Sequence, residues 1–419
     1  MAKRMRFILS TIMVIVAMTA KAQVTTSSLS GKVTDPDKEA IIGATVQAIH
    51  EPSGTRYGAI TNIDGRYTIQ GMRAGGPYSV EVSYIGYQTM MYKDVTLQLG
   101  EVYNLNVQMK ESSELLEEVV VTAQKTKFAS EKTGATTNIS NTQIASMPSV
   151  SRSITDYSRL SAYGGNGMSF AGSDGRTANF TIDGANFNNN FGLSSNLPGG
   201  GNPVSIEAID EIQIVISPFD VRQTNFIGGG INAITKSGTN TYKGTAYIYH
   251  QNENMRGDAI DRETILGARE KDQSTTYGFT IGGPIIKNKL FFFANGELQN
   301  TPAIANRWRA SEDGVANADA YISRATVADL QNVSDIAKER YGYDTGSFSS
   351  FPSDNKNTKL LARIDWNINN NHRLALRYNY TKNTVWNAPN ASSMDGGTRM
   401  SGSRTSVCHV VCQLHVFLG

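Results

Sequence analysis

Runs in which apolar and polar residues alternate recur along most of the 419-residue chain, and such period-two runs predict half-buried β-strands. Between residues 28 and 110, the alternation is seen in Tyr78–Tyr84 and in Leu105–Met109. Turn residues separate these runs, and Asp64-Gly65 is the strongest hairpin signal among them. About five to seven strands in a segment of this length predict a β-sandwich of two packed sheets.

A second set of alternating runs, rich in Tyr and Phe, begins after residue 238. These runs are Tyr242–Tyr249, Tyr277–Gly283, Lys289–Glu297, Leu360–Ile368 and Leu374–Tyr380. Strands of about 10 residues, an aromatic excess and a very short turn at Asn369–Asn371 are typical of a transmembrane antiparallel β-barrel. Residues 301–356, with a helical pattern at 325–340, would form an external loop. A soluble sandwich is the alternative interpretation.

Residues 128–238 combine Gly- and Asn-rich stretches with two more alternating runs, Ile212–Ile216 and Ile231–Lys236. Gly and Asn tolerate positive φ angles, so the stretches predict tight turns and long irregular loops. Because strands flank these loops, we expect a folded domain here and not a disordered segment.

Charge and cysteine content narrow the class of protein. With 39 Lys+Arg against 37 Asp+Glu, the net charge is +2, which argues against a polybasic nucleic-acid binder. The two cysteines, Cys408 and Cys412, leave residues 1–407 without any, so a disulfide framework or Cys-based zinc site is excluded there. We expect no nucleic-acid partner.

The N-terminus has the pattern of a secretory signal peptide. Three cations precede the apolar segment Phe7–Ala20, and Ala20-Lys21-Ala22 supplies the small residues of a cleavage site. The segment is short against the ~20 residues of a spanning helix. We therefore expect residues 1–22 to be removed and any membrane span to be made of β-strands.

Four short motifs between residues 28 and 110 resemble the carboxypeptidase regulatory-like domain. They are Gly31–Asp35, Ile42–Val46, Thr61–Tyr67 and Val82–Tyr87. The resemblance implies a transthyretin-like, non-catalytic accessory module.

Residues 111–127 are predicted to form a linker, whose acidic first part is followed directly by Val119–Ala123. Consecutive β-branched residues favour an extended backbone, which suits strand addition to a partner's sheet; an ordinary strand of the following domain is equally consistent. Glu117–Ala123 resembles the TonB box of TonB-dependent outer-membrane receptors. The resemblance implies that the periplasmic domain of TonB, energised from the inner membrane, is contacted by Glu118, Val119, Val120, Val121, Thr122 and Ala123.

Two stretches of residues 128–238 resemble the plug domain of the same receptors. They are Asn179–Gly184 and the run from Ile206 to Gly238. The run has Ser217 before Pro218 where the family usually has Gly. That departure, together with the accessory domain at 28–110, points to the Oar-like subgroup. The resemblance implies a mixed α/β plug. Its Asn-rich loops hold candidate ligand contacts, with local loop packing as the alternative, at Phe187, Asn188, Asn189 and Phe191.

Two metal-site patterns were weighed and discarded. His250 and Glu253, with His372 downstream, resemble a zinc carboxypeptidase ligand set, but no general base accompanies them. The group Cys408, His409, Cys412 and His415 lacks the two separated pairs of a structural zinc site. We expect no metal, no cofactor and no enzymatic activity.

The fold class predicted is mainly β: a transthyretin-like sandwich, a mixed α/β plug and an incomplete transmembrane antiparallel barrel. The predicted domains are a signal peptide (1–22), the sandwich (28–110), the linker (111–127), the plug (128–238), a partial barrel (239–407) and an aberrant tail (408–419). The barrel is expected to be incomplete, because about 22 strands of about 9–11 residues would not fit after residue 238. We read the tail as a truncation or frameshift.

The expected function is energy-coupled passage of an unidentified extracellular ligand across the outer membrane, with TonB and outer-membrane lipid as partners. The alternative from another class is a secreted or surface-bound, β-rich adhesion protein.

Overall fold

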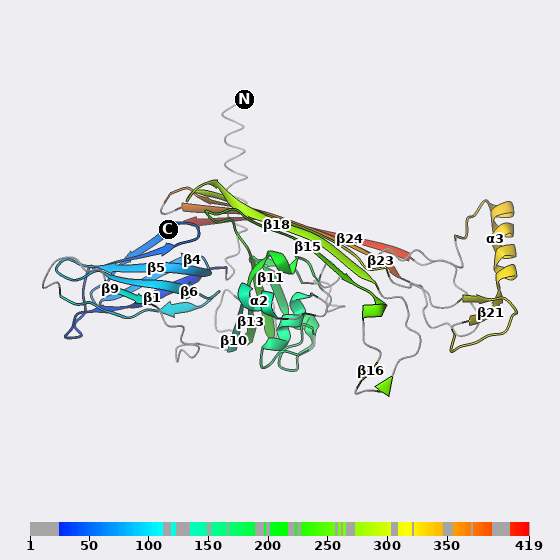
Figure 1. Cartoon of the computed structure of the whole chain (residues 1–419), viewed down its shortest axis with the longest axis horizontal. Coiled ribbons are helices and arrows are strands. Elements are labelled where there is room, and N and C mark those ends of the chain that lie inside the picture. Colours follow the sequence, from blue (N-terminus) through cyan, green and yellow to red (C-terminus); the bar gives the residue numbers. More distant parts are fainter. Residues whose placement is uncertain are drawn as a thin grey trace, which may run out of the picture.

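A computed structural model of the chain contains three bodies: a β-sandwich, a plug-like domain and a long curved sheet (Figure 1). The structure describes residues 25–111, 119–122, 135–147, 149, 152–165, 167–188, 197, 202–216, 223, 228–255, 259–260, 263–264, 273–302, 309–320, 322–346, 355–369, 372–387 and 403–418. The predicted signal peptide lies outside these residues.

The sandwich consists of two sheets that enclose one apolar core. The four-stranded sheet is formed by β4 (Arg66–Met72), β1 (Ser27–Thr34), β7 (Val102–Asn104) and β8 (Val107–Gln108), the last two both pairing with β1. The five-stranded sheet has the order β3 (Thr55–Ile60), β2 (Thr45–His50), β5 (Gly75–Ser83), β6 (Met90–Leu97) and β9 (Val119–Thr122). The alternation read from the sequence appears as burial, since Tyr78, Val80 and Val82 are fully buried. The predicted sandwich is confirmed.

The plug-like domain surrounds a five-stranded sheet with short helical turns. The sheet order is β10 (Ala135–Ser140), β13 (Ile209–Ile216), β14 (Gly229–Thr235), β11 (Asn179–Ile182) and β12 (Ala185–Asn186). The helical elements are α2 (Asn141–Ser146) and the 3-10 helices η1 (Ile154–Leu160), η2 (Gly175–Thr177) and η3 (Ile206–Ala208). Its core includes Phe180, Ile212 and Ile231. Long loops between short strands and helices match the mixed α/β expectation.

The third body is an antiparallel six-stranded sheet. Its order is β15 (Lys243–Gln251), β18 (Ser274–Ile286), β19 (Leu290–Asn300), β22 (Lys356–Asn367), β23 (His372–Asn387) and β24 (Ser403–Leu418). At one end of the sheet, only residues 287–289 separate β18 from β19 and only residues 368–371 separate β22 from β23, while the connections at the other end are long. Those longer connections contain η4 (Glu253–Met255), β16 (Ala259–Ile260), β17 (Glu263–Thr264), β20 (Arg309–Ser311), β21 (Ile322–Thr326) and α3 (Val327–Tyr341).

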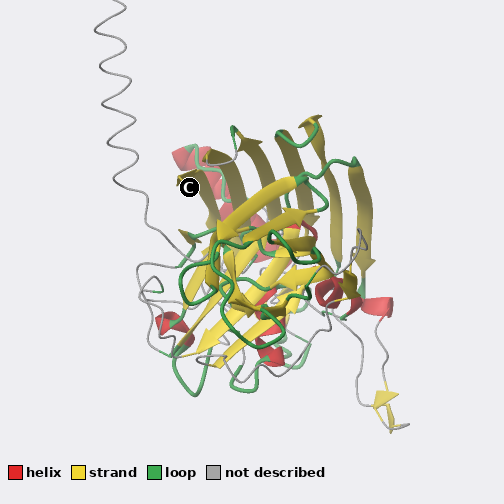
Figure 2. Cartoon of the chain, turned by 90° about the vertical axis from the view of Figure 1, so that its left-hand side faces the viewer, coloured by secondary structure: helices red, strands yellow, loops and turns green. Residues whose placement is uncertain are grey.

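The two faces of this sheet reverse the arrangement usual in soluble proteins, in which the apolar face is buried and the polar face is exposed. One face is exposed and apolar, with Phe279, Leu298, Ile364, Trp366 and Leu376. The other is buried and polar, with Asn295, Glu297, Lys359, Arg363, Asp365, Arg377 and Asn379. Apolar-out and polar-in alternation is the pattern of an outer-membrane barrel. In both views the sandwich and the plug-like domain lie on the same side of the sheet (Figures 1 and 2).

The external segment contains the helix expected from its pattern. Helix α3 begins after Thr326, whose side-chain oxygen accepts the Asp329 N–H at 3.1 Å, and it ends at Gly342 in a left-handed conformation. None of the helices within the described residues has the length and apolar character needed to cross a bilayer.

The segment that contains the predicted aberrant tail, residues 408–419, lies largely within a strand. Residues Ser403–Leu418 form β24, which pairs with β23 in continuous antiparallel register from Asn387↔Ser403 to His372↔Leu418. The segment is rich in Val, Leu and Phe, which favour strands, and β23 offers it a bare row of backbone donors and acceptors. The alternation pattern of a segment does not report whether an unpaired sheet edge is available to pair with it.

Candidate functional site

The box segment forms a strand, but not with the domain that follows it. Val119–Thr122, as β9, pairs in parallel with β6 of the preceding sandwich, with Met90 opposite Val119 and Lys93 opposite Thr122. Glu118 and Ala123 lie outside the described residues. Of the strands that the structure describes, β6 is the partner of β9, so β9 is an edge strand of the sandwich. The alternative of a strand in the following domain is therefore wrong.

The chain is fastened to the same edge just before the box. Tyr87 forms a bridge with Glu111, and the Gln88 N–H donates to the Lys110 carbonyl at 2.9 Å. Tyr87 and Gln88 lie just before β6, so the chain contacts this edge at Lys110 and Glu111 and again, as β9, at Val119–Thr122.

A buried charged cluster joins the plug-like domain to the polar face of the sheet. Asp183, in the turn after β11, accepts hydrogen bonds from the Thr235 N–H at 3.0 Å and from the Thr235 hydroxyl at 2.6 Å. Two sheet guanidinium groups approach the same carboxylate, with Arg377 Nε at 3.4 Å and Arg363 Nη1 at 3.9 Å. Arg363 also donates to the Thr235 carbonyl at 2.6 Å and holds Asp365 through two hydrogen bonds.

The cluster keeps Asp183 ionised despite its burial. Burial alone would raise the pKa of Asp183, but Arg377, Arg363 and the two hydrogen bonds from Thr235 outweigh it and hold the pKa below its ordinary value. A buried carboxylate between two arginines is a strong positional constraint, because moving it would leave uncompensated charges behind.

The sandwich also reaches this cluster. Arg73, between β4 and β5, lies with its Nη2 atom 3.8 Å from Asp365 Oδ1 and donates from Nη1 to the Ser237 hydroxyl at 2.7 Å. All three bodies therefore meet at one ionic network.

A second polar cluster lies further along the sheet. Glu297 on β19 accepts from Lys359 at 2.8 Å, from the Ser205 hydroxyl at 2.7 Å and from the Tyr247 hydroxyl at 2.9 Å. Ser205 belongs to the plug-like domain, whereas the other three residues belong to the sheet. The plug is thus tied to the polar face at two separate places.

The turn between β6 and β7 enters the edge of the plug sheet. Leu99 is fully buried against Ala74 and Ile234, and its N–H donates to the Glu211 carboxyl at 3.0 Å. Its carbonyl accepts from the side chains of Gln213 and Asn138. Burial raises the pKa of Glu211 to about 8, with further contributions from Asp210 and Glu101 and an opposing one from the Leu99 N–H.

The raised pKa of Glu211 predicts a pH-dependent contact. Glu211 binds its proton more tightly when buried, so its stabilising effect is complete below about pH 4.5 and is lost as the pH rises through about 8. Between these values the docking equilibrium should weaken by up to about tenfold per pH unit. Hydrogen exchange at Leu99 between pH 5 and 9 measures this.

The matched variant for that experiment is Glu211→Gln, which keeps a side-chain acceptor and cannot ionise. After correction for intrinsic exchange rates, the protection of the Leu99 amide in this variant should no longer vary with pH. A variant whose pH profile equals that of the unsubstituted chain would show that another group is responsible.

The sandwich further contacts the short-turn end of the sheet. The Asn240 N–H donates to the Pro52 carbonyl at 2.8 Å, and the Asn367 amide donates to the Thr55 hydroxyl at 3.0 Å. The Arg373 guanidinium lies 3.9 Å from the centre of the Tyr57 ring. Helix α3 lies at the opposite end of the sheet (Figure 1). The sandwich and the box are therefore at the end with short turns, which in outer-membrane barrels is the periplasmic end.

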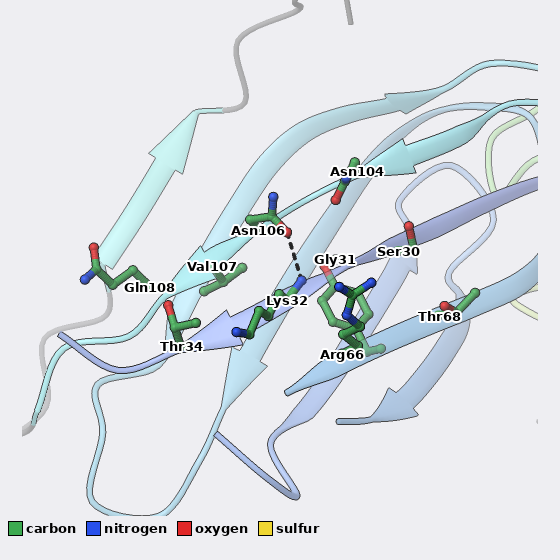
Figure 3. A pocket seen from close by; sticks show the side chains of 11 residues that line it. Ser30, Gly31, Lys32, Thr34, Arg66, Thr68, Asn104, Asn106, Val107 and Gln108 are labelled. Atoms are coloured by element: carbon green, nitrogen blue, oxygen red, sulfur yellow. Dashed lines mark hydrogen bonds between the residues drawn. The ribbon is translucent and has the colours of Figure 1, made fainter. Parts of the chain in front are cut away.

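An open groove of about 550 Å³ lies on the four-stranded sheet, where β1 changes partner from β7 to β8 (Figure 3). Gly31 is required there, because a Cβ atom would overlap the Leu105 carbonyl. The lining residues include two cations, Lys32 and Arg66, on an open surface. We assign this groove no function.

The predicted ligand contacts do not form a common surface in the described part of the plug. Phe187 is buried in the plug core, as the loop-packing alternative held. The Asn188 side chain accepts the Phe180 N–H at 2.6 Å and donates to Asn179 at 2.9 Å, so it braces the loop. Asn189 and Phe191 lie outside the described residues. A ligand role for Asn188, Asn189 and Phe191 stays a prediction.

The discarded metal-site residues have ordinary partners. His250 pairs with the Thr275 hydroxyl at 2.8 Å, and His372 contacts the Asn369 side chain at 3.0 Å. Within the described residues, no group of three His, Cys, Asp or Glu side chains is placed to hold a metal ion.

Sequence reasoning missed the charged cluster. Its signal was present: Arg363 and Asp365 alternate with apolar residues along one run, and Arg377 does so along the next. If the apolar positions face lipid, these charges must face inward, where only a polar partner can stabilise them. The partner, Asp183, is about 180 residues away in sequence, and no local pattern links them.

Comparisons with known proteins agree with this architecture. Residues 28–110 match the carboxypeptidase regulatory-like domain, and residues 234–307 match an outer membrane β-barrel domain. The TonB-dependent transporter Oar of Myxococcus xanthus is 27% identical over 227 residues, which cover 51% of this chain and 19% of that relative. The chain thus spans well under two thirds of the relative's length.

Solved structures similar to this chain include a siderophore receptor and an outer membrane transporter. The siderophore receptor PirA of Acinetobacter baumannii is 20% identical with a TM-score of 0.38, over 59% of this chain and 31% of that one. The outer membrane transporter YddB of Escherichia coli is 12% identical with a TM-score of 0.41, over 60% of this chain and 33% of that one.

Residues 28–110 are thus similar to a carboxypeptidase regulatory-like domain, and residues 234–307 to an outer membrane β-barrel domain. The similarity to the TonB-dependent transporter Oar agrees with the resemblance that the sequence motifs carry.

Proposed function

We propose that this chain serves in the outer membrane as the N-terminal part of a TonB-dependent receptor, which couples passage of an extracellular ligand to force from the inner membrane. The observation that carries the proposal is the plug-like domain, tied by buried ionic contacts to the polar face of a sheet whose other face is apolar. Lipid would cover the apolar face, and the plug would occupy the lumen.

The order of elements suggests how force would reach the plug. The box is followed by residues 124–134 and then by β10, which is the edge strand of the plug sheet and pairs with β13. Tension applied to the box would therefore act first at Ala135. Pulled from its end, β10 would leave β13 one pair at a time, which requires less force than shearing all the pairs together.

The ionic cluster lies on a different part of the plug. Asp183 and Thr235 belong to β11, β14 and their connections, on the side of the sheet away from β10. The plug could then lose its first strand while the rest stays attached to the barrel wall. This division supports partial displacement of the plug as the step that opens a path.

The relative named above, Oar, is a TonB-dependent transporter, and we propose no catalytic step for this chain. The secreted adhesion alternative is not carried further, because a soluble sandwich would not expose an apolar face such as that of the six-stranded sheet.

Replacing Val120 with proline tests the function. Proline removes a backbone donor from the box and should abolish strand addition by TonB. We expect retention of the detergent-solubilised chain by the immobilised periplasmic domain of the host's TonB to fall by at least about tenfold.

Val120→Thr is the matched control, since it keeps the N–H and the β-branched side chain. It should bind within about twofold of the unsubstituted chain. Equal retention of the proline variant, or no retention of the unsubstituted chain, would reject the assignment of the box.

A further inference from the structure

The box is already part of a sheet in this structure. Val119–Thr122 occupy the edge of the sandwich as its fifth strand, in register with four consecutive residues of β6. A partner that adds a strand to the box uses the same type of backbone hydrogen bond that β6 uses. We propose that the edge of β6 is an intramolecular competitor that weakens the binding of TonB to the box, and that TonB displaces β6 from β9 when it binds. This inference rests on the TonB-dependent function proposed above.

The docking edge has a defined length. It begins after Tyr87 and Gln88, where the linker is fastened at Glu111 and Lys110. It ends at Lys93, because the next residue, Asp94, has a φ of 61° and breaks the extended conformation of the strand. Between these limits β6 presents Met90–Lys93, which matches the four residues of β9.

The short linker between Glu111 and Val119 favours the pairing of β9 with β6 over pairing with a separate molecule. Only residues 112–118 separate the fastened Glu111 from Val119, so the loop that must close is short. A strand held by such a linker meets its partner edge at an effective concentration on the order of millimolar. A four-residue pairing that would be weak between separate molecules can therefore stay formed within one chain.

The connections of the sandwich explain why TonB should displace β6, and not simply add to the outer side of β9. The sandwich is bonded to the plug through Leu99, to the sheet through Thr55 and to the ionic cluster through Arg73. If β9 stayed on β6, tension on the box would load these contacts. It would not reach Ala135, where β10 begins. Transmission to the plug thus requires β9 to leave the sandwich.

A reversible cross-link between the two strands tests the proposal in the full chain. Lys93 and Thr122 are partners in register, and Lys93 is exposed, so Lys93→Cys with Thr122→Cys leaves the sandwich core unchanged. Adjacent strands place Cα atoms about 5 Å apart, within the range of a disulfide. The native cysteines are removed as Cys408→Ser and Cys412→Ser.

The control is a second cross-link in the same background. Thr45→Cys with Ile60→Cys joins β2 and β3 at the far edge of the same five-stranded sheet, where both side chains are exposed. Each protein is compared, oxidised and reduced, for binding to the periplasmic domain of TonB.

We expect the Lys93–Thr122 pair to oxidise readily, and its oxidised form to bind TonB at least about tenfold more weakly than its reduced form. The control pair should bind equally in both states. Failure of the Lys93–Thr122 disulfide to form would overturn the pairing, and equal binding of its oxidised and reduced forms would overturn the competition. If neither the reduced form nor the unsubstituted chain binds TonB, the proposed function itself fails, while the yield of the cross-link still reports whether β9 lies on β6.

Discussion

Asp183→Asn is expected to weaken the attachment of the plug to the sheet by about 3–5 kcal/mol. Asparagine keeps the shape and an acceptor for the Thr235 N–H, and it tolerates the positive φ of 49° at this position. It removes only the negative charge. Arg363 and Arg377, both almost fully buried, would then face each other with one fewer acidic partner, while Asp365 still holds Arg363 through hydrogen bonds and Asp210 acts on it electrostatically.

Release of the plug is measured in detergent at increasing denaturant concentration. The readout is the extent of protease cleavage within the plug. Asp174→Asn is the control, because Asp174 pairs with Arg176 at 2.6 Å on an exposed turn of the same domain. That surface pair should have no measurable effect on plug release. A similar response to both substitutions would show that buried charge does not hold the plug.

Leu99→Ala is expected to loosen the sandwich from the plug by about 2–5 kcal/mol, through lost apolar contact and the cavity left behind. The side chain is fully buried against Ala74 of the sandwich and Ile234 of the plug. The substitution keeps the backbone groups that bond to Glu211 and Gln213, so it isolates the packing contribution.

Leu97→Ala provides a control two residues away. Leu97 is equally buried, but it packs in the core of the sandwich. Hydrogen exchange should separate the two variants: Leu99→Ala should expose amides at the contact with the plug, and Leu97→Ala should lower protection throughout the sandwich. If Leu99→Ala lowered protection throughout the sandwich instead, Leu99 would belong to the folding of that domain and not to its docking.

Strands whose buried face is determined by their own alternation of side chains could be predicted from the sequence. Tyr78–Tyr84 and Leu105–Met109 alternate with a period of two, and burial follows that alternation through Ser83 in the first run and throughout the second. The same holds for Leu360–Ile368, where Leu360, Ala362, Ile364 and Trp366 are exposed and Arg363 and Asp365 are buried. In both bodies the local pattern determines the face, because successive side chains of a strand must point in opposite directions.

Two features depended on partners that no local pattern names. The segment Val119–Thr122 was recognisable as an extended, partner-seeking strand, yet its partner in this structure is β6 of its own chain. Residues 408–419 were predicted to be an aberrant tail, and most of them belong to β24 on the edge of β23. In each case an unpaired sheet edge supplies backbone hydrogen bonds to whichever extended segment can reach it, and reach is a property of the tertiary structure.

The sequence by itself therefore determined the sandwich, the plug-like domain, the barrel strands and their two faces, since alternation, turn residues and motifs are local. Only the tertiary structure decided which charges meet and which strand the box joins. Asp183, Arg363 and Arg377 are widely separated along the chain, and their meeting depends on how the plug lies against the sheet. Buried charges and bare strand edges both require a partner, and three-dimensional proximity selects it.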